Sequence, residues 1–168
     1  MINPYSRIPH AWVVTVVALV ATAIVAWLMT PSLALLRTPE APKRIASLEL
    51  ARDAESARKV IDSWKDGGIE AAKTSIRLDC LFIPAYSTLL AFIWFGAAHW
   101  LRGRVPGLPT FVTAWGWAMW GAGILDYVEN WCDYRMIEHG ATDSLARISS
   151  VCATVKFVVT LVLIKTLF

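Results

Sequence analysis

The chain has 168 residues, a formal net charge of +3 and a 57% hydrophobic composition that includes nine tryptophans. Its mean hydropathy of +0.52 is too high for a soluble domain of this size and indicates a membrane protein. The small, dispersed charge offers no cluster of Lys and Arg beside exposed aromatic residues, which argues against a nucleic-acid partner.

Long apolar stretches dominate the sequence. A transmembrane helix needs about 20 consecutive apolar residues. The stretches that reach or approach this length cover residues 11–30, 76–100, 108–131 and 144–168. We therefore predict an all-α polytopic membrane protein, a four-helix transmembrane bundle that forms a single membrane domain over residues 1–168.

The predicted location is the plasma or inner membrane. The first stretch, which Pro31 is expected to end, is longer than the apolar core of a signal peptide, so we interpret it as a retained span. The tail, the turn at 102–104 and the C-terminus contain basic residues and no acid, which favours cytoplasmic termini. The whole connection between spans one and two, residues 31–75, holds eight Lys and Arg and favours the opposite orientation.

The part of this connection over residues 38–67 is predicted to contain an amphipathic helix. Thr38-Pro39-Glu40 is a helix start signal, an apolar stripe runs from about Lys43 to Lys65, and Gly67-Gly68 is expected to end the helix. Two interpretations remain open: the helix lies on the bilayer surface, or it caps the bundle above a cavity.

The second span carries an acid about one turn from its start, Asp79. Pro84 follows and removes the hydrogen bond to the carbonyl of Cys80, so we predict a free backbone acceptor beside Asp79. Tyr86 lies two turns deeper on the same face. A tight turn at 102–107 makes spans two and three antiparallel neighbours, which places Asp79 and Asp126 about 30 Å and 27 Å from that turn. The acids should therefore meet near one membrane face.

The third span presents its polar groups on one face, and the last span contains a single charge well inside it, Lys156. A polar link over 132–143 is expected between them. Ionised groups inside a membrane are kept only when they are paired, hydrated or used. We predict a ligand site formed by Asp79, Tyr86, Trp115, Met119, Asp126, Glu129, Asn130 and Lys156.

Three kinds of chemistry fit these residues. An acidic pocket with aromatic walls could bind a membrane lipid or another amphipathic small molecule. Crowded carboxylates also suit proton transfer or isomerisation, with Asp79, Asp126 and Glu129 as catalytic candidates. Hydrolysis and nucleotide chemistry have no support, because the sequence contains no P-loop, G-x-S-x-G or H-E-x-x-H motif.

Binding of a divalent metal ion is the second of the three kinds of chemistry, and no other cofactor is indicated. Asp126-x-x-Glu129 has the spacing of helix-bundle metal sites, Asp79 would complete three oxygen ligands, and His139 could add an imidazole. Oxygen ligands suit Mg²⁺ or Mn²⁺.

Buried ion pairing is the third alternative. Asp126 and Glu129 would then pair with Lys156 and Arg147, and Asp79 with Arg77. In that case the chain would be an accessory or structural subunit of a larger membrane complex, or a homo-oligomer. The small residues of the third span would provide contact surface.

The octet Asp79-Cys80-Leu81-Phe82-Ile83-Pro84-Ala85-Tyr86 resembles the acid–proline–tyrosine second helix of the EXPERA family, the sigma-2 receptor and sterol isomerase group. The layout is also similar, with a long first connection and acids within the helices. The resemblance implies a small membrane bundle with a lipid-accessible pocket. The first span of this chain carries no acid, which departs from the family pattern.

Overall fold

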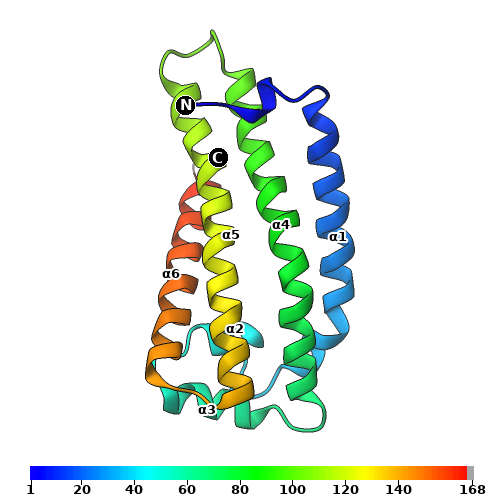
Figure 1. The fold of residues 1–168 in the computed structure, drawn as a ribbon, viewed down its shortest axis with the longest axis vertical. Coiled ribbons are helices and arrows are strands. Elements are labelled where there is room, and N and C mark those ends of the chain that lie inside the picture. Colours follow the sequence, from blue (N-terminus) through cyan, green and yellow to red (C-terminus); the bar gives the residue numbers. More distant parts are fainter. Residues whose placement is uncertain (166–168) are drawn as a thin grey trace.

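The computed structural model describes the backbone of residues 1–165 and the side chains of residues 1–161. Over this part the chain is all-helical. Its elements are η1 (Pro4–Ser6), α1 (Ala11–Leu35), α2 (Ile45–Glu49), α3 (Ala54–Ser63), α4 (Gly68–Trp100), α5 (Leu108–His139) and α6 (Asp143–Lys165). The long helices α1, α4, α5 and α6 alternate in direction, and α2 and α3 lie across one end, which we call the cap end (Figure 1). The last three residues of the predicted fourth span lie outside the described part.

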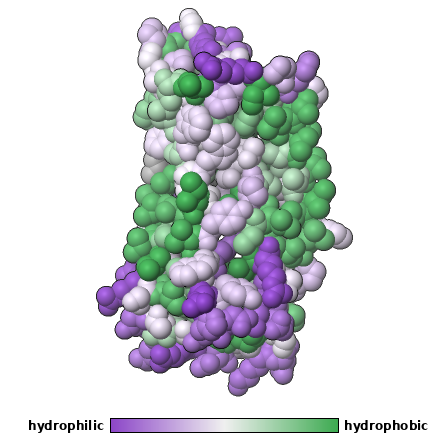
Figure 2. Space-filling model, in the orientation of Figure 1, coloured by the Kyte–Doolittle hydropathy of each residue, from purple (hydrophilic) through white to green (hydrophobic). Residues whose placement is uncertain are grey.

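The helices α1, α4 and the first 19 residues of α6 are long and apolar enough to cross a membrane, which fits a membrane-embedded protein. The helix α5 is nearly as long as α4 but carries Asp126, Glu129 and Asp133 in its second half, and it is not among these candidate spans. Apolar side chains form a broad band between two polar ends (Figure 2).

The long helices pack in a row. The principal contacts join α1 to α4, α4 to α5, and α5 to α6, so that α4 and α5 are the inner members. The outer helices α1 and α6 expose many large apolar side chains, among them Val17, Trp27 and Leu161. Because α4 and α6 both pack on α5, a groove can form between them.

An aromatic cluster holds α4 against α5 at the end opposite the cap. Phe95 of α4 is fully buried and meets Trp117 and Trp120 of α5 edge-on, with ring centroids 5.8 and 5.6 Å away. The ring sits directly against Gly116, where a side chain would collide with it. The N-terminal tail joins this region through Asn3, whose Nδ2 donates to the Phe95 carbonyl at 2.9 Å.

A second apolar cluster lies under the cap. Leu48 of α2, Ala57 of α3, Trp64 and Met136 of α5 are buried together there. The indole Nε1 of Trp64 donates to the carbonyl of Leu36 at 3.0 Å and ties the cap to the end of α1. The connection thus packs on the helix ends, as in the second of the two interpretations above.

The cap also contradicts one sequence prediction, because two short helices replace the single amphipathic helix. The turn after Glu49 ends α2, and Asp53 then begins α3 by accepting a hydrogen bond from the Ser56 amide at 2.8 Å. Asp143 of α6 accepts from the Ala54 amide at 2.8 Å, which fixes the start of α3 to α6.

The long helices also extend beyond their predicted bounds. Pro31 lies inside α1, which continues to Leu35, so the prediction that this proline ends the helix was wrong. Gly67 is the N-cap of α4, which begins eight residues before position 76. α5 continues to His139, because Cys132 and Met136 are buried against other elements rather than exposed in a polar link.

Candidate functional site

Polar contacts replace aromatic packing in the cap half of the α4–α5 interface. Asn130 Nδ2 donates to Asp79 Oδ2 at 2.7 Å, so the two helices bring these residues together. Tyr127 Oη donates to the Cys80 carbonyl at 2.8 Å. The acceptor that Pro84 releases is therefore occupied by α5, and the prediction of a free acceptor beside Asp79 was wrong.

Lys156 of α6 joins two acids of α5. Its Nζ lies 2.5 Å from Asp126 Oδ1 and 2.8 Å from Glu129 Oε1, and only 13% of its side chain is exposed. Tyr86 of α4 donates to the other oxygen of Asp126 at 2.5 Å. The carboxylate of Asp126 thus links α4, α5 and α6.

The other predicted ion pairs do not form. Among the described side chains, Arg147 and Arg77 make no ion pair with Asp126, Glu129 or Asp79. Arg147 is exposed on the outer side of α6. The charge of Asp126 and Glu129 is therefore offset by Lys156 alone within this part of the chain.

A pocket of about 310 Å³ opens between α4 and α6 beside this network. Its lining comprises Glu49, Asp79, Phe82, Tyr86, Asp126, Lys156, Phe157 and Thr160. The rings of Phe82 and Tyr86 lie 5.2 Å apart, and the Lys156 ammonium lies 5.0 Å from the Phe157 ring. The pocket therefore combines charged groups with aromatic walls.

Asp79 has one carboxylate oxygen left for another partner. In the described structure, side-chain hydrogen bonds occupy both oxygens of Asp126 but only Oδ2 of Asp79. Because Asn130 fixes the orientation of Asp79, its Oδ1 is a preoriented acceptor at the wall of the pocket.

A cluster of three carboxylates adjoins the pocket through Glu49. Glu49 of α2 and Glu129 and Asp133 of α5 are buried, and an oxygen of each lies within 4.8 Å of the others. Ser149 Oγ donates to Asp133 Oδ1 at 2.6 Å. Burial raises the pKa of the Glu49 carboxyl, and the nearby Lys156 partly opposes this rise.

Sequence reasoning missed Glu49 and Asp133. Asp133 could have been found, because it follows Glu129 by four residues and so shares its helical face. Glu49 carries no such signal, since it is one of several charges in a segment that looks solvated.

Three predicted residues lie elsewhere. Met119 is buried in the aromatic half of the α4–α5 interface, and Trp115 packs at its edge with its ring 5.2 Å from that of Phe111. His139 is the exposed last residue of α5. None of the three lines the pocket described above.

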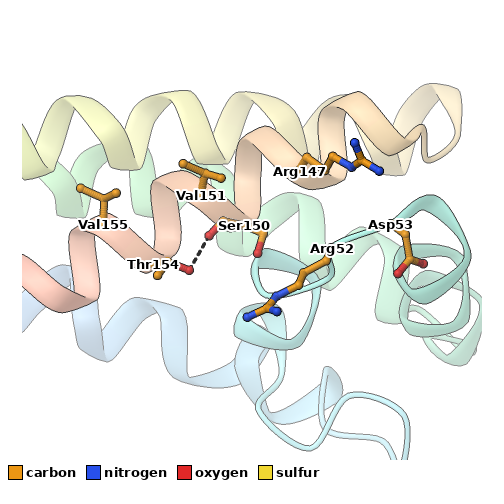
Figure 3. A pocket seen from close by; sticks show the side chains of 7 residues that line it. All are labelled: Arg52, Asp53, Arg147, Ser150, Val151, Thr154 and Val155. Carbon is orange, nitrogen blue, oxygen red and sulfur yellow. Dashed lines mark hydrogen bonds between the residues drawn. The ribbon is translucent and has the colours of Figure 1, made fainter.

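Other, larger cavities include two on the surface of the cap, which are lined mainly by exposed residues such as Glu40 and Lys59. Two more lack converging polar groups. A cavity of about 610 Å³ on the outer side of α6 is lined by Arg52, Asp53, Arg147, Ser150, Val151, Thr154 and Val155. Its two arginines extend away from each other (Figure 3). A groove of about 370 Å³ between α1 and α4 is lined almost wholly by Val, Ala and Pro. The pocket at Asp79 is therefore the strongest candidate site.

No protein-family model, curated protein or solved structure matches the chain. The function is accordingly argued from the geometry of the pocket.

Proposed function

We propose that this membrane protein binds an amphipathic small molecule in the pocket between α4 and α6. The polar end of the ligand carries an amine or hydroxyl that donates a hydrogen bond to Asp79 Oδ1. The apolar body lies against Phe82, Phe157 and Thr160. The observation that carries the proposal is the oriented, unshared oxygen of Asp79 in a pocket with aromatic walls.

The proposal places α5 across the membrane as a fourth span. Its 32 residues extend for about 48 Å at 1.5 Å per residue, which exceeds the thickness of the hydrocarbon core. It packs along α4 and α6, both of which are candidate spans. The acids of α5 face these neighbours, so they avoid the lipid that would penalise them.

Charge supports a donor rather than an anion as the polar group. The lining contains the three carboxylic acids Glu49, Asp79 and Asp126 but a single cation, Lys156. Lys156 is already engaged by Asp126 and Glu129. An anionic ligand would meet repulsion and find no free cation among the described lining residues, whereas an amine or hydroxyl finds an acceptor.

The position of the pocket opening supports a ligand that enters from the bilayer. The pocket lies between α4 and α6, which make few direct contacts with each other. Phe157 in the lining of the pocket is 40% exposed. An acyl or alkyl chain can therefore leave the pocket toward lipid while the polar end stays on the α5 side.

The proposal is tested with a long-chain primary amine that bears a diazirine on its alkyl chain. The purified protein is irradiated with this probe in detergent, and the adducts are mapped by mass spectrometry. We expect adducts near Phe82 on α4 and near Phe157 and Thr160 on α6.

The variant Thr160→Phe fills the pocket and should abolish these adducts. Thr154→Phe is the matched control, because it makes the same change on the same helix at the separate outer cavity. Adducts that spread evenly over α1 and α6, or that persist in Thr160→Phe, would refute binding at this pocket.

A further inference from the structure

We infer that Glu49, Glu129 and Asp133 bind one divalent metal ion, of the class that prefers oxygen ligands, and that this ion fastens α2 of the cap to α5. This site adjoins the proposed ligand pocket, because Glu49 belongs to both. The inference does not depend on ligand binding, because it rests on unpaired oxygens of Glu129 and Asp133, which do not line the pocket.

The spacing of the oxygens fits a single ion. One oxygen from each carboxylate lies within 4.8 Å of the other two. Magnesium, manganese and calcium bind oxygen at about 2.0–2.6 Å, so two ligands of one ion lie at most about 5 Å apart. The three side chains can therefore reach the same ion with small adjustments.

Two unpaired atoms point to a missing partner. Glu129 and Asp133 are both 0% exposed, yet Glu129 Oε2 and Asp133 Oδ2 have no hydrogen-bond partner in the described structure. The second oxygen of each is held, by Lys156 and Ser149 respectively. Buried polar atoms are nearly always paired, so these two unpaired oxygens are the positions at which we infer that a cation binds.

The hydrogen bonds from Lys156 and Ser149 orient the proposed ligands. Groups that hold the far oxygen of a carboxylate commonly support metal ligands in this way. In the described part of the chain, Lys156 provides the only ion pair to this group of acids. A divalent ion would offset two more charges, and an all-carboxylate set suits magnesium, manganese or calcium better than zinc.

The test is a titration of the purified, chelator-treated protein with Mn²⁺, followed by electron paramagnetic resonance. We expect one bound Mn²⁺ per chain in the wild type. Glu49→Gln and Asp133→Asn should weaken its binding at least about tenfold. Glu55→Gln, on the exposed side of α3, and Asp79→Asn, in the pocket, are matched controls that should bind Mn²⁺ as the wild type does.

Thermal unfolding provides a second test, because the variants and the wild type should respond differently in chelator and in Mn²⁺. In chelator, Glu49→Gln and Asp133→Asn should unfold at or above the wild-type Tm, because each removes a crowded negative charge. Saturating Mn²⁺ should then raise the Tm of the wild type and leave that of the variants unchanged.

Absence of stoichiometric Mn²⁺ binding by the wild type would overturn the inference, whether or not the variants fold. Equal Mn²⁺ binding by wild type, Glu49→Gln and Asp133→Asn would also overturn it. Loss of binding in Asp79→Asn with retention in Glu49→Gln would place the ion in the pocket and would equally contradict the assigned ligands.

Discussion

The two halves of the α4–α5 interface are built on opposite principles. Away from the cap, Phe95 packs against Gly116 and two tryptophans in a dense apolar contact. Toward the cap, the same two helices meet through Asp79 with Asn130 and through Tyr86 with Asp126. Close packing needs no ligand to be stable, whereas buried carboxylates need partners at every oxygen.

The difference suggests a division of labour. Aromatic packing fixes the helix pair at one end, so the other end can hold charged groups that would be unfavourable in an isolated helix. The cap adds to this end, since Leu48 and Trp64 pack in the apolar cluster under the cap and Glu49 reaches the acids of α5. Substitutions in one half can therefore be compared directly with substitutions in the other.

The largest effect is expected for Lys156→Met. The substitution leaves Asp126 and Glu129 buried without their cation, and breaking a buried ion pair in this way costs about 3–5 kcal/mol. Thermal unfolding in detergent should show a large fall in Tm. Lys59→Met is the control, because Lys59 pairs with Glu55 at the exposed surface of α3 and its loss should leave the Tm nearly unchanged. Equal effects of the two changes would contradict the account.

Gly116→Ala tests the apolar half. An added Cβ would lie 2.3 Å from Cε1 of the buried Phe95 ring, so the ring or the helix must move, at a cost of about 1–3 kcal/mol. Gly121→Ala on the same helix meets no atom within 4 Å and should be neutral or slightly stabilising. Unfolding by denaturant measures both, and a neutral Gly116→Ala would show that this contact does not hold the helices together.

Tyr127→Phe tests how α5 satisfies the proline break in α4. Loss of its hydrogen bond to the Cys80 carbonyl should cost about 1 kcal/mol. Pro84→Ala restores an amide that can donate to the same carbonyl, so Tyr127→Phe should cost much less in that background. The double-mutant cycle from unfolding measurements supplies the coupling, and additive effects would refute the exchange of donors.

Asp53→Ala should have the smallest effect, on the cap alone. Hydrogen bonds from Ser56 lower the pKa of Asp53, so its contribution to stability is present above the pKa of the unfolded chain and is lost as the pH falls through the folded pKa. The Tm difference between wild type and Asp53→Ala should therefore shrink in acid. Asp62→Ala, at an exposed position of the same helix away from its N-cap, is the control and should change the Tm less than Asp53→Ala does at neutral pH.

The sequence predicted the pairing of α4 with α5 because the turn at 102–107 is short. The rise per residue of a helix then gives the distance of each side chain from that turn. It therefore placed Asp79 and Asn130 together. It also named Lys156, since a lone lysine inside an apolar stretch needs an acid near it. The spacing of residues shows which of them share a helical face. It does not show how far along that face a neighbouring helix remains in contact. For this reason Trp115 and Met119 were grouped with the acids, although they lie in the aromatic half.

The cap was beyond sequence reasoning for a different reason. A charge in a short amphipathic segment has the same local pattern whether it faces water or a buried cluster. Glu49 is buried because Leu48 and Trp64 pack the segment onto the ends of the long helices, and that contact is tertiary. The hydrogen-bond partner of the Cys80 carbonyl was equally beyond prediction from sequence. Pro84 predicts that this carbonyl loses its helical donor, but only the packing of α5 shows that Tyr127 donates to it instead.

The central claim is that the cap half of the α4–α6 groove selects a donor group through Asp79. It is tested most directly by photolabelling the wild type with three diazirine probes that share one alkyl chain and end in an amine, a hydroxyl or a carboxylate. The account predicts saturable labelling of α4 and α6 near Phe82 and Phe157 by the amine and the alcohol, and little by the carboxylate. Equal labelling by all three probes, or preference for the carboxylate, would contradict it.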